Sequence, residues 1–422
     1  MLRLAYFADD FTGATDALES LALAGLRTRL FLDSPTAAQC TGLDAIGVAG
    51  LTRSLAPGDM ETVLRPTFTA LRALGPRHVH YKVCSTFDSS PTVGSIGRAI
   101  DVGISVFGGR TVPLLVAAPA LGRYCVFGNL YARYSIDSAG AIHRLDRHPT
   151  VSRHPVTPIT EADLRVHLAA QTKKKSGLLS VLDLERPLAE TAGAWAGLVA
   201  AGHEIILIDG LNAGHLLQAG ALLDGLAKGG PLFSVGSSGI ESALTAHWGT
   251  TGLGSDRPKA GQSMTGPTLV ISGSCSPVTA GQIDWALTNG YTGIEFSPTA
   301  LADSVAALKA GRPTIVFTSR GEAAAPRPAS ELGTQLGRLA REAVAKAGVK
   351  RLVVAGGDTS SYAARALGIK SLEMLVPLVP GAPLCRAQAP GSSADGLEVN
   401  FKGGQVGAPD YFGTAAGHTR IL

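Results

Sequence analysis

The 422-residue sequence contains few charged side chains and no long hydrophobic run. Charged residues make up 17% of the chain, the formal net charge is +4, and hydrophobic residues make up 45%. This balance excludes disorder for the bulk of the chain and provides no concentrated basic face for nucleic acid. No apolar run approaches the ~18 residues of a membrane span. Neither nucleic acid nor a membrane is therefore predicted as a partner.

Cysteine is scarce, and its spacing fits neither a disulfide framework nor a zinc site. The five cysteines form no CxxC pair and are Cys40, Cys84, Cys125, Cys275 and Cys385. Free thiols are typical of a reducing compartment, so a cytoplasmic location is predicted. Residues 1–10 lack the long apolar core and cleavage site of a signal peptide, and they are predicted to form a buried first strand.

Four catalytic signatures are absent from the sequence. Without GxxxxGK[ST] the chain is not a P-loop enzyme, and without GxGxxG a Rossmann dehydrogenase has no positive support. The absence of HExxH and GxSxG weakens the zinc-protease and α/β-hydrolase interpretations. The chemistry must therefore come from other residues.

Glycine, by contrast, is abundant: 52 residues, against a usual share of ~7%. Short apolar runs alternate with amphipathic stretches, which predicts βαβ units and mostly parallel sheets. Strands are predicted at 2–8, 27–32, 45–48, 78–83, 112–117, 178–182, 204–208, 268–272, 313–318 and 351–355. Helices are predicted at 14–24, 59–74, 189–201, 331–348 and 359–367.

The alternation is interrupted by a stretch rich in Gly, Ser, Thr, Pro and Lys at 249–266. We interpret residues 249–267 as a linker between a first domain, 1–248, and a second domain, 268–422. The predicted fold class is α/β, with two α/β domains and the active site in the cleft between them, where ligand sites are common.

Two adjacent carboxylates, Asp9 and Asp10, fall where the first strand should end. Thr12 and Gly13 follow, and a helix is predicted just beyond them. Ligands bind at the carboxyl ends of parallel strands, so this cluster is a candidate site. Helix capping explains one of these acids but not both. The acids are adjacent rather than two apart, which disfavours an aspartyl-phosphate phosphatase.

Lys82 lies near the end of an apolar strand and is followed by Ser85 and Thr86. A lysine at a strand end can meet an anionic substrate, whereas a plain polar loop is the alternative. His148 and His154 each precede a proline. For these histidines, contact with an acid substrate and a purely structural role are comparably supported.

Three glycine turns mark the second domain. The first two each lie between a strand and a helix start, where small residues let the backbone approach a phosphate, and the third comes near the end of the chain. They are predicted to cradle phosphates and comprise Ser272-Gly273-Ser274-Cys275-Ser276, Gly356-Gly357-Asp358-Thr359 and Gly403-Gly404.

Taken together, these motifs resemble the four-carbon acid sugar kinase family. The resemblance rests, in order along the chain, on 8–14, 82–86, 94–97, 118–120, 154–158, 273–276 and 356–359. It implies a sugar-acid-binding first domain, an ATP-binding second domain, and phosphorylation of a hydroxyl of a small sugar acid with Mg²⁺ on the phosphates.

The resemblance also implies roles for particular residues. The sugar acid would face Asp9, Asp10, Thr12, Arg53, Lys82, Ser85, Thr86 and His154, and Arg53 and Lys82 would pair with its carboxylate. Asp10 would orient the attacking hydroxyl, with Asp9 as the alternative. ATP would bind at Ser272, Gly273, Ser274, Ser276, Gly356, Gly357, Asp358, Thr359, Gly403 and Gly404. No residue is assigned as a metal ligand.

The segment Cys84 to Ser89 resembles the 3-oxo-tetronate branch of that family. Ser95 and the 402–407 segment depart from the usual pattern, which leaves a related substrate open, including a branched 3-oxo acid derived from apionate. A threonate or erythronate kinase, a non-catalytic sugar-acid sensor and a dehydrogenase are the alternatives. The sequence leaves a homodimer open as well.

Overall fold

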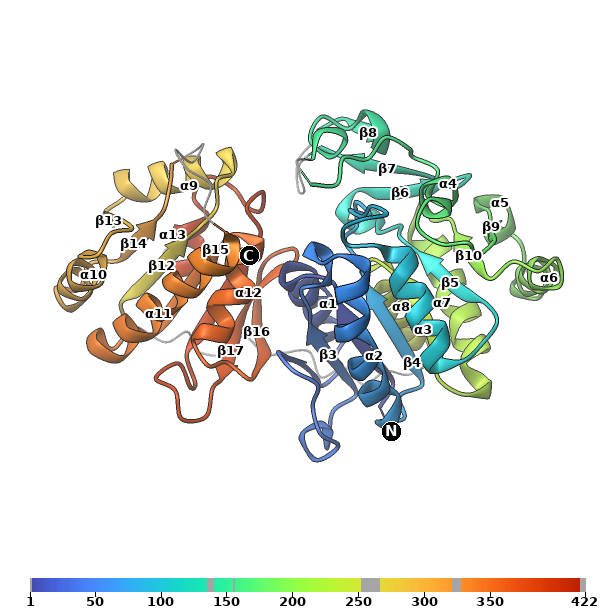
Figure 1. Ribbon diagram of the computed structural model, residues 1–422, viewed down its shortest axis with the longest axis horizontal. Coiled ribbons are helices and arrows are strands. Elements are labelled where there is room, and N and C mark those ends of the chain that lie inside the picture. Colours follow the sequence, from blue (N-terminus) through green and yellow to red (C-terminus); the bar gives the residue numbers. More distant parts are fainter. Residues whose placement is uncertain (1, 135–139, 155, 252–265, 321–327, 418–422) are drawn as a thin grey trace. The chain divides into compact units, whose positions relative to one another are not determined.

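The computed structural model describes the whole chain except residues 1, 135–139, 155, 252–265, 321–327 and 418–422 (Figure 1). Its contacts form two compact units, Met1–Thr28 with Ser34–Arg257 and Arg29–Asp33 with Pro258–Leu422. The predicted linker, 249–267, lies mostly outside the described residues. Within the described ranges, no helix combines the length and hydrophobicity needed to cross a membrane.

The first unit is built on a parallel sheet whose strands are short and apolar. Strands buried on both faces need such continuous hydrophobic runs, and β1 and β3 are buried at every position. The strand order is β3 (Ala45–Ala49), β1 (Leu4–Ala8), β4 (His78–Lys82), β11 (Leu232–Gly236), β5 (Val112–Leu115), β10 (Ile205–Ile208) and β9 (Ser176–Leu179).

Helices cover this sheet in two groups. The first group packs together as α2 (Pro57–Ala73), α3 (Ile96–Phe107) and α4 (Leu164–Ala169). The second comprises α1 (Phe11–Leu23), α5 (Val181–Leu184), α6 (Leu188–Ala200), α7 (Ala213–Leu226) and α8 (Gly239–Thr250). Local sequence sets several starts: Asp10, Ser95 and Asn212 cap α1, α3 and α7 with their side chains.

A small antiparallel sheet follows β5 in the chain: β6 (Arg123–Val126), β7 (Asn129–Arg133) and β8 (Ile142–Arg144). Its first hairpin is joined by Phe127 and Gly128, both at positive φ. The buried carboxylate of Asp209 accepts hydrogen bonds from both of their backbone N–H groups, at 2.7 and 3.0 Å. The hairpin is thereby fixed to the end of β10.

The second unit combines a parallel sheet with antiparallel strands. The parallel strands are β13 (Thr292–Glu295), β14 (Thr314–Phe317), β12 (Thr268–Ser272), β15 (Arg351–Ala355) and β18 (Glu398–Lys402). The antiparallel strands continue the sheet as β17 (Ala382–Gln388), β16 (Ser371–Val379) and β2 (Thr28–Phe31).

The helices of the second unit are α9 (Pro277–Thr288), α10 (Ala300–Lys309), α11 (Ala329–Ala347), α12 (Gly357–Ala366) and α13 (Tyr411–Ala416). α10, α11 and α12 pack as one group, and α9 packs on α13. Aliphatic strand residues such as Val270, Ile315 and Val353 form a core with Tyr411 and Phe412 of α13.

The predicted α/β class and the mostly parallel sheets are confirmed. Two details differ. The strand predicted at 178–182 ends at Leu179, because Ser180 and Asp183 form a capping box that begins α5. The strand predicted at 27–32 exists as β2, but it pairs with β16, and the contacts assign Arg29–Asp33 to the second unit. The domain boundaries predicted from the sequence did not include this excursion of the chain.

Candidate functional site

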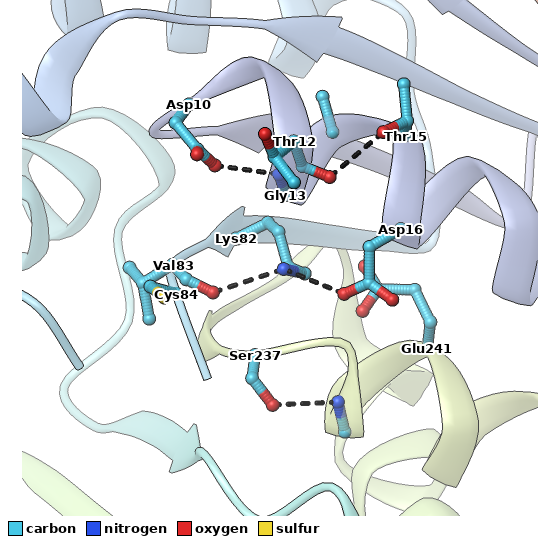
Figure 2. Close-up of polar contacts among 12 residues, drawn as sticks. Asp10, Thr12, Gly13, Thr15, Asp16, Lys82, Val83, Cys84, Ser237 and Glu241 are labelled. Carbon is cyan, nitrogen blue, oxygen red and sulfur yellow. Dashed lines mark hydrogen bonds and ion pairs between the residues drawn. The ribbon is translucent and has the colours of Figure 1, made fainter. Parts of the chain in front are cut away.

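Asp9 and Asp10 follow β1 directly, and the fold uses them differently. Asp10 is the N-cap of α1, where its Oδ1 accepts a hydrogen bond from the N–H of Gly13 at 2.7 Å (Figure 2). Asp9 is not a cap; its backbone N–H donates to the carbonyl of Lys82 at the end of β4. Its side chain is 3% exposed and that of Asp10 is 17% exposed. Asp10 is therefore the carboxylate that a substrate reaches more easily.

Arg53 joins the two carboxylates. Its Nη2 lies 2.9 Å from Asp9 Oδ1, and its Nη1 lies 2.9 Å from Asp10 Oδ2. Burial disfavours the charged guanidinium, but the carboxylates of Asp10 and Asp9 outweigh that and raise the pKa of Arg53. Gly94, at φ +61, passes so close that an added Cβ would lie 2.5 Å from the Arg53 carbonyl oxygen. Glycine at this position lets the loop before α3 lie against Arg53.

Burial raises the pKa of Asp9 to about 6, although Arg53 opposes the shift. The unfolded carboxyl titrates near 3.8. Between these values the folded chain binds more protons at Asp9, so its stability falls as the pH rises through the window from about 4 to about 6.

Asp9→Asn is expected to remove this part of the decline, because the amide does not ionise. Relative to the variant, the wild-type chain should lose stability from about pH 4 to about pH 6 and then level off. Melting temperatures of both proteins across this range measure the effect. A difference that stays constant with pH would show that the pKa of Asp9 is not raised.

Lys82 ends β4 and is fully buried beside Asp16 of α1. Its Nζ lies 3.2 Å from Asp16 Oδ2 and donates to the carbonyl of Val83 at 3.2 Å (Figure 2). Burial alone would lower the pKa of Lys82, but Asp16 and Glu241 more than compensate and raise it. The lysine is therefore a permanent cation whose charge is balanced by the chain itself.

A second buried pair, His80 with Glu241 of α8, adjoins this lysine. Glu241 Oε1 lies 2.6 Å from His80 Nδ1, and His80 Nε2 faces the carbonyl of Gly236 at 3.1 Å. Both ring nitrogens thus face oxygen atoms of the chain. Glu241 Oε2 is buried and has no hydrogen-bond partner in the described part of the chain. The sequence interpretation gave no role to Asp16, the last residue of its first candidate segment, and did not identify His80 or Glu241.

The loop after β4 carries the predicted Ser85 and Thr86. Thr86 Oγ1 lies 2.9 Å from Cys84 Sγ and donates to Asp88 Oδ1 at 2.8 Å, which orients the acid. Phe87 is buried at φ +58, a strained conformation for a residue with a side chain. Backbone strain of this kind is often stored beside functional sites.

The remaining predicted residues of the first unit are placed as follows. Thr12 lies in the first turn of α1, and its carbonyl accepts from Thr15 Oγ1 (Figure 2). His154 Nδ1 accepts from the N–H of Thr157 at 3.0 Å and lies 3.1 Å from its Oγ1. These contacts give His154 a structural part in its own loop, while its predicted contact with substrate stays a prediction. His148 is buried, and burial lowers its pKa.

In the second unit the three glycine turns come together. The N–H of Gly273 donates to the carbonyl of Ala355 at 3.2 Å, and the N–H of Gly356 donates to the carbonyl of Lys402 at 2.9 Å. Ser274 Oγ accepts from the N–H of Ser276, whose own side chain caps α9. The predicted residues are thus neighbours at one edge of the sheet.

Only glycine fits this packing. An added Cβ would lie 2.4 Å from Thr359 Oγ1 at Gly273 and 2.7 Å from Ser274 Oγ at Gly404. Gly356 is at φ +120, whereas Gly357 is simply the first residue of α12. α12 begins without a capping side chain, and a helix start of this kind attracts anions. The residues present therefore fit a phosphate group.

Lys402, which the sequence interpretation left unassigned, supports the third turn. It is fully buried, and its Nζ donates to Thr279 Oγ1 at 3.1 Å while Thr279 Oγ1 donates to the carbonyl of Gly404 at 2.8 Å. Its Nζ also lies over the ring of Tyr411. Burial lowers the pKa of Lys402 to about 7. An anion bound near Lys402 would favour its charged form and so raise this pKa.

Among the residues described, no group of three or more His, Cys, Asp or Glu side chains could hold a metal ion. A metal that accompanies a nucleotide does not need such a group, because Mg²⁺ keeps several waters and binds phosphate oxygens with one or two carboxylates.

Comparisons with known proteins bear on both units. Residues 4–244 match a family model described as a sugar-binding N-terminal domain, and residues 269–412 match one described as a nucleotide-binding C-terminal domain. The 3-oxo-isoapionate kinase of Paraburkholderia graminis is 40% identical, covering 98% of this chain and 93% of that protein. The 3-oxo-tetronate kinase of Cupriavidus necator is 30% identical, covering 98% and 96%.

Solved structures show the same fold over the full length. A structure from Salmonella typhimurium LT2, described as a tRNA synthase, matches with a TM-score of 0.80 and 26% identity, covering 98% of each chain. A protein from Haemophilus influenzae matches with a TM-score of 0.73, at 23% identity, covering 98% of this chain and 99% of that one.

Proposed function

The chain belongs to the four-carbon acid sugar kinase family, and from this membership we propose that it transfers a phosphoryl group from ATP to a hydroxyl of a 3-oxo sugar acid. The observation that carries the proposal is the end-to-end similarity to a 3-oxo-isoapionate kinase, together with the converging glycine turns of the second unit. A non-catalytic sugar-acid sensor would have no need of these turns.

The proposed substrate is 3-oxo-isoapionate, with 3-oxo-tetronate as the second candidate. The 40% identity to the first kind of kinase exceeds the 30% identity to the second. The departures at Ser95 and in the 402–407 segment agree with a substrate that differs from 3-oxo-tetronate.

In the first unit Asp10 would orient the attacking hydroxyl and accept its proton. It is the more exposed of the two acids, and α1 and Arg53 fix its carboxylate from two sides. Asp9, buried and held by Arg53, would keep that guanidinium in place. Phosphoryl transfer depends mainly on such positioning and on charge neutralisation. Thr12, Ser85 and Thr86 would supply hydroxyl contacts to the sugar acid.

In the second unit Ser272, Gly273, Ser274, Ser276, Gly356, Gly357, Thr359, Gly403 and Gly404 would hold the phosphates of ATP. Asp358 is the carboxylate among the proposed nucleotide-binding residues and would hold Mg²⁺ next to the phosphates. The bound metal would neutralise charge that develops on the phosphoryl group. The cytoplasm stays the proposed compartment because the cysteines are few and widely spaced. A homodimer also stays a prediction.

A substrate panel tests the proposal. The purified chain is given Mg²⁺-ATP with 3-oxo-isoapionate, 3-oxo-tetronate, threonate and erythronate, and ADP and phosphorylated product are measured, with Asp10→Asn as the inactive control. The highest kcat/KM is expected with 3-oxo-isoapionate. Higher values with threonate or erythronate would support the alternative kinase, and binding of an acid without turnover would support the sensor.

A further inference from the structure

The two cations assigned to the substrate carboxylate are already neutralised by the chain. Arg53 pairs with both Asp9 and Asp10, and Lys82 pairs with Asp16. A substrate carboxylate placed on Arg53 would also lie next to two like charges, which is unfavourable. The sugar acid therefore needs another cation for its carboxylate.

Arg123 is such a cation. It follows the carboxyl end of β5, and its backbone exchanges two hydrogen bonds with Ala118, at 3.0 and 3.1 Å. It is 6% exposed. Its Nη1 donates to the carbonyls of Leu121 at 3.0 Å and Arg133 at 3.1 Å. Within the described part of the chain, no carboxylate lies within ion-pair distance of its guanidinium.

The unused side of Arg123 has the right chemistry for a carboxylate. Its Nε is buried and has no hydrogen-bond partner among the residues that the structure describes, and the carbonyls occupy only Nη1. The Nε–Nη2 edge is the fork that binds a carboxylate through two parallel hydrogen bonds. Arg27 shows this contact elsewhere in the molecule: its Nε and Nη2 donate to the two carboxylate oxygens of Asp44 at 2.9 and 3.0 Å.

The same arrangement recurs at Arg165, whose Nε and Nη2 donate to Asp163 at 3.0 and 2.6 Å. Arg123 is the buried counterpart whose fork holds no acid of the described chain. Burial lowers the pKa of Arg123, and Asp88 and Cys84 oppose the shift only in part. This reflects the cost of a buried charge that no described carboxylate contacts directly. An anionic ligand would offset that cost.

Arg123 also belongs to the neighbourhood of the first unit's site. Asp88 and Cys84, in the loop after β4, act to raise the pKa of both Arg53 and Arg123. β1, β4 and β5 belong to the same parallel sheet, and Asp10, this loop and Arg123 follow their carboxyl ends. Asp10 and Arg123 thus lie at the same edge of the sheet, with β4 and β11 between the two strands that they follow.

We propose that Arg123 binds the carboxylate of the sugar acid, and that Arg53 and Lys82 instead hold Asp9, Asp10 and Asp16 in position. This inference rests on the proposed function and specifies which group recognises the acid. The reacting hydroxyl then lies at the Asp10 end of the site.

The test compares the sugar acid with its neutral primary amide as phosphoryl acceptors. For Arg123→Met, kcat/KM on the acid is expected to fall on the order of 10²-fold, as for loss of a charge-assisted bidentate contact. The rate on the amide and the KM for ATP should change little, so the preference for the acid disappears. Arg123→Lys should restore part of that preference, because it keeps the charge but not the fork.

Two further variants make the result specific. Lys82→Met should lower the rates on acid and amide by similar factors, because it disturbs Asp16 rather than the carboxylate contact. Arg144→Met removes an arginine from the same small sheet, where it pairs with Asp146 on the surface, and should leave the preference unchanged.

The outcomes separate this inference from the proposed function. If the wild type phosphorylates the acid and folded Arg123→Met keeps its preference over the amide, Arg123 does not bind the carboxylate. If Arg123→Met does not fold, Arg123→Lys decides instead: a partial loss of the preference for the acid supports the proposal, and the full wild-type preference overturns it. If the wild type phosphorylates neither compound, the proposed function is wrong, and calorimetry of the acid with wild type and variant still decides whether Arg123 binds it.

Discussion

Asp10→Asn is expected to lower kcat by about 10²–10⁴-fold, the usual loss when a general base is removed. The chain should stay folded, because the amide oxygen of Asn also accepts a hydrogen bond at a helix N-cap. The variant removes only the negative charge that faces Arg53 and the ability to accept a proton. Single-turnover measurements with ATP and the sugar acid would isolate the chemical step, and binding of both ligands should be largely retained.

Asp163→Asn is the matched control. Asp163 also caps a helix, α4, and also pairs with an arginine, Arg165. If a loss of capping charge were enough to reduce turnover, both variants would show it. A wild-type kcat in Asp10→Asn would show that Asp10 is not the general base, and Asp9 would then be tested in that role.

Most of the architecture could be predicted because the strands of a parallel sheet are buried on both faces. β1 and β3 are continuous apolar runs that stand out in the sequence, and β15 is apolar after its first residue, Arg351. β16 and β17 were missed although they pair with each other across the short turn at 380–381, because their residues alternate in burial less regularly. The assignment of Arg29–Asp33 to the second unit could not be predicted from the neighbouring sequence, because it depends on the pairing of β2 with the distant strand β16.

For the candidate site, the sequence identified residues but not their partners. Asp9, Asp10 and Lys82 were found because charged residues at the ends of apolar strands are unusual. Their ion pairs with Arg53 and Asp16 join distant parts of the chain, so only the folded structure reveals them. Arg123 was missed for the same reason: an arginine becomes informative only when its burial and its unpaired fork are known.

The structure also changes which glycine of the second turn matters most. Gly357 is the first residue of α12, whereas Gly356, just before it, is at φ +120. An added Cβ at Gly356 would lie 3.0 Å from Thr359 Oγ1 and 3.4 Å from the backbone N of Ser274. The position is therefore restricted both by its backbone conformation and by its closeness to the first glycine turn.

Gly356→Val is expected to raise the Kd for ATP on the order of 10-fold to 10²-fold, because strain of about 1–3 kcal/mol must be relieved by moving the phosphate-binding turns. A branched Cβ also obstructs the backbone N–H groups that a phosphate needs. Binding of the sugar acid should be nearly unchanged, because its proposed residues lie in the other unit. Isothermal titration calorimetry with each ligand measures both constants.

Gly290→Val supplies the control for strain alone. Gly290 is also in the second unit and at positive φ, +88, but nothing lies within 4 Å of an added Cβ. This variant should lose stability and keep its affinity for ATP. If Gly356→Val folds and its affinity for ATP is unchanged, the nucleotide does not bind at the glycine turns. Loss of affinity for both ligands, with a normal melting curve, would instead show that ATP and the sugar acid depend on one shared set of residues.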